Sequence, residues 1–346
     1  MKIFEENLTL LFFLGMWKPT EWSPGNYKSV LYTIYTFLII IISGTFFITE
    51  LLDLILVTSN IAEFTNNIFM LSAIFAACFK ILIILLRRNV LNNIIDDLKN
   101  YMLKNDKYSK EEIIIWTRYS HIIKFLSLFY MSSTFFGVTM MTFATVSVNI
   151  SRRELLYRAW VPYNYSRPIA YWVSALGQLL GMYILAGVNV GFVLLFSGIL
   201  ISTCSLINIL LFRKVQNLFS LTMAFQYCLG SIIFCTSAYN MSKMKVLSFE
   251  FLSCVLYVSN IMIELFIICF STNEMTLEFG KLHNAFYDCQ WYLLNNENKK
   301  LIGLLMTNSI KPVHFTCVYV LNLSLESFSK VLKLSYSIYN LLQSAF

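Results

Sequence analysis

Seven long apolar runs constrain this chain more than any other feature of its sequence. A helix that crosses a bilayer needs about 20 mainly apolar residues, because the hydrocarbon core is about 30 Å thick and each residue rises about 1.5 Å. The runs lie at about 29–57, 61–86, 119–148, 169–212, 216–239, 247–270 and 313–343. The stretches between them are too short for a separate soluble domain. We therefore predict an all-α membrane protein, a single domain over residues 1–346 with seven transmembrane helices.

The small proportion of charged residues excludes most soluble classes of protein. Of the 346 residues, 58% are hydrophobic and 13% are charged, whereas about 25% of a typical globular chain is charged. Because so few charges cannot cover a chain of this size, apolar surface must face lipid. This excludes a cytosolic enzyme, a disordered protein and, despite the net charge of +7, a protein that binds nucleic acid.

The sequence also lacks the motifs of enzymes and metal sites. It contains no H-E-x-x-H, no G-x-S-x-G and no phosphate-binding Gly-Lys-Ser/Thr loop. The three histidines, His121, His283 and His314, lie in separate regions without Cys or carboxylate residues at ligand spacing. We predict no catalytic activity, no cofactor and no metal ion.

The distribution of Lys and Arg predicts the orientation of the chain. With seven spans, sixteen of these residues fall on the side of the N-terminus and six on the other side. Positive charge marks the cytoplasmic side, so we expect an intracellular N-terminus and an extracellular C-terminus. The first residues, with the apolar run Leu8–Trp17, lack the basic start and cleavage site of a signal peptide. We expect them to form a membrane-surface or re-entrant helix.

The run at 169–212 is long enough for two spans, but neither Pro nor a charged cluster interrupts it. We therefore expect one span that continues as a helix beyond the membrane. Gly177 and Gly181 are four residues apart, and so are Gly187 and Gly191. Small residues at this spacing let a neighbouring helix approach closely.

Ionisable residues inside the spans are few, and each is costly in lipid. Lys80 lies near the inner end of its span, and we expect it to extend its amine toward the interface. For Glu264 a helix–helix contact and a functional role are equally good interpretations.

The last run differs from the others because it contains Glu326, Lys330 and Lys333 together with many Ser residues. Glu326 and Lys330 are spaced as an ion pair on one helix face. A helix this polar is either the buried centre of the bundle or the wall of a water-filled pathway built from several copies. We favour the pathway.

Apolar faces with a few hydroxyl and amide groups suit a small, mostly hydrophobic ligand. Such faces occur on the second, third, fourth and sixth runs, although plain helix packing would use the same residues. The candidate ligand-binding residues are Ile68, Phe69, Ser72, Tyr130, Thr134, Gly137, Met141, Ser174, Gln178 and Tyr257.

Several segments along essentially the whole chain resemble the insect odorant receptor family. The segment Leu10-Leu-Phe-Phe-Leu-Gly-Met-Trp-Lys-Pro19 is similar to the family's N-terminal segment. Tyr157-Arg-Ala-Trp160-Val-Pro162, followed by Pro168-Ile-Ala-Tyr171-Trp172 and Gln178, resembles its approach to the fourth helix. The most specific similarity is C-terminal: Phe286-Tyr-Asp-Cys-Gln-Trp291, then Leu305, Met306 and Pro312, and the final helix from Ser327 to Leu342.

The resemblance implies a subunit of an odorant-gated, non-selective cation channel in the plasma membrane of a sensory-neuron dendrite. Family members bind small volatile hydrophobic ligands in the outer half of the bundle and assemble as tetramers with the olfactory coreceptor. The last helix of each subunit lines the cation pore. The family's gate corresponds here to Asn340, Leu341, Leu342, Ser344 and Ala345. One departure is the short link around Arg213–Phe219, where the family has a longer cytoplasmic connection that helps to hold the tetramer together.

Two other classes are alternatives. A gustatory receptor of the same superfamily would have a Thr-Tyr pair with Gln six positions after the Tyr. Here Ser335-Tyr336 is followed by Gln343, seven positions on. A G-protein-coupled receptor would have an extracellular N-terminus, an Asp-Arg-Tyr triplet and an Asn-Pro-x-x-Tyr motif, and the sequence contains neither motif.

Overall fold

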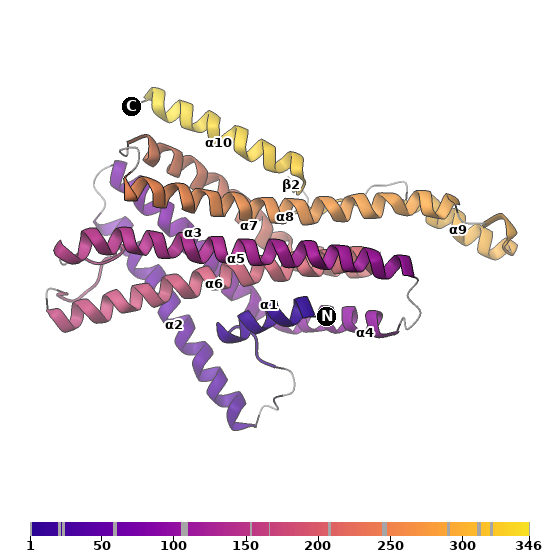
Figure 1. Ribbon diagram of the computed structural model, residues 1–346, viewed down its shortest axis with the longest axis horizontal. Coiled ribbons are helices and arrows are strands. Elements are labelled where there is room, and N and C mark those ends of the chain that lie inside the picture. Colours follow the sequence, from indigo (N-terminus) through magenta and orange to yellow (C-terminus); the bar gives the residue numbers. More distant parts are fainter. Residues whose placement is uncertain are drawn as a thin grey trace.

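The computed structural model describes residues 2–345 except 20–21, 23–24, 58–60, 105–109, 153, 166, 207–208, 244–247, 289–290, 310–312 and 319–320. The described residues are almost entirely helical (Figure 1). The helices are α1 (Lys2–Phe13), α2 (Tyr27–Leu56), α3 (Ile61–Leu86), α4 (Arg88–Lys104), α5 (Lys110–Arg152), α6 (Pro168–Leu206), α7 (Ile209–Lys243), α8 (Phe249–Asp288), the 3₁₀ turn η1 (Trp291–Leu293), α9 (Asn296–Ser309) and α10 (Leu325–Ala345). Two short strands, β1 (Thr316–Cys317) and β2 (Leu321–Asn322), precede α10.

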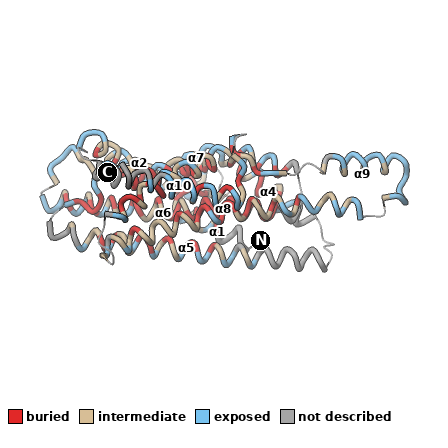
Figure 2. The backbone as a smooth tube through the Cα atoms, turned by 90° about the horizontal axis from the view of Figure 1, so that it is seen from above, coloured by how far each residue is buried: buried red, intermediate tan, exposed pale blue. Residues whose placement is uncertain are grey.

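The long helices lie side by side in an elongated bundle, which α2 crosses obliquely (Figure 1). Helix α5 packs against α6 and α8, α6 packs against α8, and α3 packs against α7. Helix α10 lies along α7 and α8. Buried residues gather in the middle of the bundle, whereas α9 at one end is largely exposed (Figure 2).

Six helices of the described residues, α2, α3, α5, α6, α7 and α8, contain stretches long and apolar enough to cross a membrane. Helix α10 occupies the seventh position, but Glu326, Lys330 and Lys333 make it too polar to qualify by composition. The prediction of an all-α membrane protein is therefore confirmed, and so is the polar character of its last helix.

Helix α6 forms the centre of the bundle. Every residue from Val190 to Thr203 is buried, and 83% of its most apolar stretch lies inside the protein, compared with 28% for α2. The helix is continuous from Pro168 to Leu206. The 169–212 run thus begins as one long helix, as expected, and its last residues belong to α7 beyond residues 207–208.

The N-terminal helix α1 packs against α6 at Gly187 and Gly191, one of the two glycine pairs expected to let a neighbouring helix approach. A Cβ atom on Gly191 would lie 2.8 Å from Leu11 Cδ2, and one on Gly187 would lie 2.9 Å from Leu14 Cδ2. Leu11 is fully buried in this contact. The absence of a side chain at these two positions lets α1 enter the bundle, whereas a Cβ atom on Gly177 would meet nothing within 4 Å.

The last apolar run starts as extended chain, and the predicted span of 313–343 therefore begins too early. Strand β1 pairs antiparallel with β2, with Thr316 opposite Asn322. Helix α10 begins only at Leu325, where the Ser324 hydroxyl accepts a hydrogen bond from the backbone N–H of Ser327 at 3.2 Å. A serine in this position satisfies a donor at the helix start that has no partner within the helix, so it fixes the first turn of α10.

Candidate functional site

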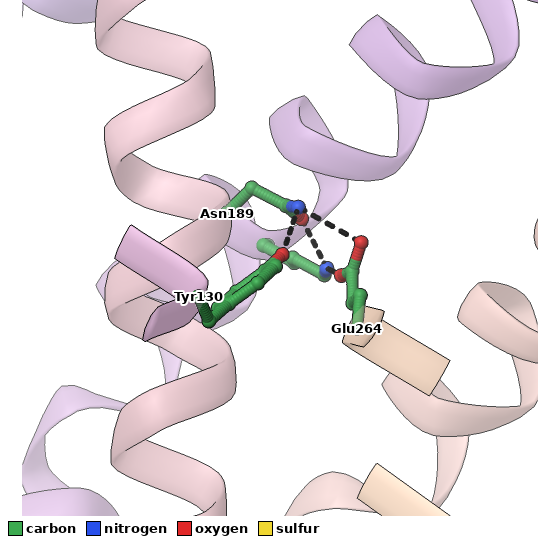
Figure 3. Close-up of polar contacts among 4 residues, drawn as sticks. Tyr130, Asn189 and Glu264 are labelled. Atoms are coloured by element: carbon green, nitrogen blue, oxygen red, sulfur yellow. Dashed lines mark hydrogen bonds and ion pairs between the residues drawn. The ribbon is translucent and has the colours of Figure 1, made fainter. Parts of the chain in front are cut away.

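A buried ion pair lies where four helices meet. Lys80 Nζ of α3 lies 2.7 Å from Glu264 Oε1 of α8, and the two side chains are 1% and 4% exposed. Asn189 of α6 donates from Nδ2 to Glu264 Oε2 at 3.0 Å and to the Tyr130 hydroxyl of α5 at 3.1 Å. Lys80 also donates to Asn189 Oδ1. Figure 3 shows these contacts, which join α3, α5, α6 and α8.

This network corrects one prediction and confirms another. Lys80 does not extend toward an interface, because Glu264 and Asn189 take up its hydrogen bonds inside the bundle. Its amine also lies 5.7 Å from the centre of the Phe192 ring. Of the two interpretations of Glu264, the structure bears out the helix–helix contact and leaves a functional role open. A charge buried at this depth is tolerated only when it is paired and hydrogen-bonded, so the pair fixes how α3 and α8 sit together.

A cavity of about 100 Å³, here called the ion-pair cavity, lies beside this network between α3, α5, α6, α7 and α8. Its walls are mostly apolar, and its polar groups are the hydroxyls of Tyr130, Thr134 and Tyr257, the amides of Asn189, Gln226 and Asn260, and the carboxylate of Glu264. Among the predicted ligand-binding residues it is lined by Tyr130, Thr134, Gly137, Met141 and Tyr257. Half of the predicted set therefore converges on one cavity.

Gly137 has a specific role in this wall. A Cβ atom there would collide with the amide of Asn260, which accepts a hydrogen bond from the Ser133 hydroxyl at 2.6 Å and donates to the Leu256 carbonyl at 3.0 Å. Glycine at 137 leaves the space that this amide occupies between α5 and α8.

A second cavity of about 320 Å³, the loop cavity, lies between the helices and residues 156–158 of the α5–α6 connection. It is more polar, with Glu50, Asn67, Asn149, Arg158 and Asn240 among its lining residues. The two cavities share Met70, Met141 and Tyr257 as a common wall. Phe69, which lines the loop cavity, packs edge-on against Tyr257 with their ring centres 4.4 Å apart.

The other predicted ligand-binding residues line neither cavity, and three of them make hydrogen bonds elsewhere. Gln178 holds the α5–α6 connection: its Oε1 accepts from the Tyr157 N–H at 3.2 Å, and its Nε2 donates to the Tyr157 carbonyl at 2.9 Å. The Ser174 hydroxyl contacts the Tyr163 hydroxyl at 2.6 Å. Ser72 donates to the carbonyl of Ile68 within α3, at 2.6 Å.

Tyr157 is a buried residue of the connection itself. Its hydroxyl lies 3.2 Å from the hydroxyl of Thr142. Burial raises the pKa of Tyr157 to about 12, an effect that the hydrogen bond with Thr142 partly offsets. The Gln178 amide and this phenol together attach residues 154–158 to the helices that form the loop cavity.

The predicted gate residues lie at the end of α10. Asn340 is exposed on this helix. The helix continues through Leu341, Leu342, Ser344 and Ala345, but the side chains of these four residues lie outside the described part of the structure. The predicted ion pair between Glu326 and Lys330 is confirmed, with 2.7 Å between Lys330 Nζ and Glu326 Oε1 on the exposed face.

The sequence-based reasoning missed Gln226, Asn189 and Asn260. All three are amides inside apolar runs. Attention to charged residues alone passed over them, whereas any strongly polar side chain in such a run needs a partner. That signal was present in the sequence and would have found them.

The fold and the cavity between its helices define a helical multi-pass membrane protein with space for a small molecule. The model of the 7tm Odorant receptor family matches residues 60–213 and 209–336. The chain therefore belongs to this family. The two matched segments meet at the link between α6 and α7, where the sequence predicts a shortened connection. Membership decides against the gustatory receptor and the G-protein-coupled receptor.

Individual relatives are distant. Odorant receptor 46a, isoform B, of Drosophila melanogaster is 27% identical over 117 residues, which cover 32% of this chain and 30% of that receptor. The putative odorant receptor 92a of the same species is 20% identical over 134 residues, 39% of this chain and 32% of that receptor. The chain thus spans about a third of the length of these curated relatives.

The fold is also that of a solved insect receptor. The structure of the olfactory receptor OR5 from Machilis hrabei in complex with eugenol superposes with a TM-score of 0.86. The superposition covers 100% of this chain and 98% of that chain, at 18% sequence identity. The helical arrangement is therefore shared over the whole chain, although few residues are.

Proposed function

We propose that this chain is an odorant receptor subunit that binds a small, volatile, mostly hydrophobic ligand and opens a cation channel. The observation that carries the proposal is the ion-pair cavity, an apolar space between five helices in a member of the odorant receptor family. Pockets for small molecules are concave, mainly apolar and lined by a few polar groups. The cavity has these properties.

Within this proposal the ligand contacts Tyr130, Thr134, Gly137, Met141 and Tyr257. The Thr134 hydroxyl is already engaged with the Tyr130 carbonyl at 2.8 Å, so Thr134 contributes mainly shape. Phe69 supports Tyr257 from the side of the loop cavity. Ile68, Ser72, Ser174 and Gln178 act indirectly, through helix packing and the α5–α6 connection.

The pore belongs to α10 in this proposal. One face of the helix, with Val331 and Ser335, is buried against the bundle. The opposite face exposes Glu326, Lys330, Lys333, Ser337 and Asn340. Lipid is a poor environment for such a face. A tetramer with the olfactory coreceptor would place it along a water-filled path for cations, and Asn340, Leu341, Leu342, Ser344 and Ala345 would form the constriction.

Cavity and pore are connected through α8. This helix carries Tyr257 and Glu264 at the cavity, and its Phe266 packs edge-on against Phe328 of α10, with ring centres 5.9 Å apart. A ligand that favours one arrangement of α8 shifts the populations of closed and open channels. A shift of the open-to-closed ratio from 1:99 to 99:1 requires about 5.5 kcal/mol of differential binding. A single small apolar molecule supplies less than this. We therefore expect partial opening.

The setting follows from the same proposal. The chain would lie in the plasma membrane of a sensory-neuron dendrite with its N-terminus in the cytoplasm, as the Lys and Arg distribution predicts. Its partners would be the olfactory coreceptor and the odorant.

A voltage-clamp experiment tests the function directly. The chain is co-expressed with the olfactory coreceptor and exposed to a panel of volatile alcohols, ketones, esters and hydrocarbons. We expect at least one compound to evoke a cation current that cells expressing the coreceptor alone do not show. A complex that reaches the cell surface and responds to no compound of the panel would contradict the proposal.

A further inference from the structure

Two residues that line the ion-pair cavity each carry a buried polar atom without a hydrogen-bond partner among the described residues. The atoms are Oε1 of Gln226 on α7 and the hydroxyl of Tyr257 on α8. Gln226 is 5% exposed. Leaving such an atom unpaired is costly, and most buried polar atoms in proteins are paired. Two such atoms in one small cavity therefore require an explanation.

The other polar groups of the cavity already have hydrogen-bond partners. Both carboxylate oxygens of Glu264 are engaged, by Lys80 and by Asn189. The Asn189 amide also contacts the Tyr130 hydroxyl, and the Asn260 amide is held by Ser133 and Leu256. The ionised groups are thus paired with each other. The two unpaired atoms are neutral: an amide oxygen, which accepts hydrogen bonds, and a hydroxyl, which can also donate one.

We propose that the ion-pair cavity selects small ligands that carry a hydroxyl group. The ligand O–H donates to Gln226 Oε1, and the ligand oxygen accepts the proton of the Tyr257 hydroxyl. This rests on the proposed function and adds the chemical class of the ligand. A ketone or ester can accept from Tyr257 but offers nothing to Gln226. A hydrocarbon leaves both atoms unpaired.

The size of the cavity limits the rest of the ligand. An engineered apolar cavity of about 150 Å³ holds benzene, and the ion-pair cavity measures about 100 Å³. Its flexible Met70, Met141 and Met182 side chains can adjust to an occupant. The expected ligand is therefore an alcohol with about one six-membered ring or a short chain.

Three compounds of similar volume test the selection: cyclohexanol, cyclohexanone and methylcyclohexane. The readouts are the half-maximal concentration for current in cells with the coreceptor and the rise in melting temperature of the purified complex. For the native chain we expect cyclohexanol to be the most potent, cyclohexanone intermediate and methylcyclohexane the weakest. Each lost hydrogen bond should cost about tenfold in potency.

Two substitutions assign the two contacts. Tyr257→Phe should weaken cyclohexanol and cyclohexanone about tenfold each and leave methylcyclohexane unchanged. Gln226→Met should weaken cyclohexanol alone. The oxygen atom that each change removes has no partner among the described residues. Tyr171→Phe and Thr222→Val are matched controls, because their buried hydroxyls are also unpaired but lie outside the cavity.

The outcomes separate this inference from the function on which it rests. Equal potency of the three compounds in the native chain would overturn the hydroxyl selection while leaving the receptor function intact. The same holds if the control variants change the potencies as much as Tyr257→Phe and Gln226→Met do. A complex that other odorants activate but that none of the three compounds activates or stabilises would also overturn the hydroxyl selection. A loss of cyclohexanone potency in Gln226→Met would contradict the assigned acceptor. Only the absence of current with every odorant of the panel bears on the proposed function itself.

Discussion

Lys80 and Glu264 are 184 residues apart in the sequence, yet their Nζ and Oε1 atoms lie 2.7 Å apart in the bundle. The pair joins α3 to α8 and, through Asn189, to α6. Neither side chain has access to bulk water. A pair of this kind is costly to break, because within the described part of the chain each charge forms its ion pair with the other.

Replacing one member of this pair should therefore destabilise the protein strongly. We expect Lys80→Met to lower the stability by about 3–5 kcal/mol, because Glu264 is left buried and unpaired. The double variant Lys80→Met with Glu264→Met should recover much of that loss. Melting temperature in detergent and the amount at the cell surface are the measurements. Lys80→Met alone melting like the native chain would contradict the ion pair.

The contact between α1 and α6 should depend on the glycine at 191. We expect Gly191→Ala to cost about 1–3 kcal/mol, because the new methyl group must displace Leu11 from a packed contact. The matched change Gly177→Ala meets open space and should leave the melting temperature unchanged or raise it slightly. Equal melting temperatures for the two variants would show that α1 does not pack at Gly191.

Gln178 should act on the α5–α6 connection and not on ligand contacts. Gln178→Leu removes both hydrogen bonds to the Tyr157 backbone, and we expect residues 154–165 to become more susceptible to proteolysis. Leu180→Ala, which shortens an exposed side chain on the same helix, is the control. Cleavage rates measured on the purified complex decide the matter. Unchanged cleavage in Gln178→Leu would argue against this role.

The exposed face of α10 should line the pore. We expect a thiol-reactive cationic reagent to reduce the odorant-evoked current after Ser337→Cys or Asn340→Cys, since both positions lie on that face. Val331→Cys is buried against the bundle and should be protected. Phe129→Cys, exposed on α5, is the control for a surface remote from α10. A current that is insensitive at both 337 and 340 would remove α10 from the pore.

High pH should weaken the attachment of the α5–α6 connection. The pKa of Tyr157 is raised to about 12, above its usual value of about 10, so the unfolded chain loses this proton first. The stabilising effect is fully present below about pH 10 and is lost as the pH rises toward 12. We expect Tyr157→Phe to reduce the fall in melting temperature over that interval. The same fall in both proteins would contradict the burial of this phenol.

The sequence predicts the helices far better than it predicts the contacts between them. Apolar runs and the polarity of Glu326, Lys330 and Lys333 are local properties, so the spans and the unusual last helix could be predicted. The pairing of Lys80 with Glu264 depends on which helices become neighbours, and no local pattern of the sequence reveals that for residues 184 positions apart. On an isolated helix Lys80 would extend its amine toward the membrane interface. In the bundle its contact with Glu264 holds the amine inside.

The candidate site likewise separates what a local pattern predicts from what depends on contacts between helices. Tyr130, Thr134, Gly137 and Met141 share a helix face, and all four line one cavity, while their contact with a ligand stays a prediction. Gln178 and Ser174 looked like ligand contacts by residue type, but the backbone of the α5–α6 connection and Tyr163 take up their hydrogen bonds. The start of α10 was placed too early because the apolar residues from 313 onward fit a strand pair as well as a helix.

Met70, Met141 and Tyr257 belong to both cavities, so we expect a molecule that passes directly from one to the other to require rotation of these side chains. The dwell time of an occupant would then reflect how often two thioethers and a phenol ring swing out of the way, and not its affinity alone. Responses to two odorants of equal affinity could then decay at different rates after the odorants are removed.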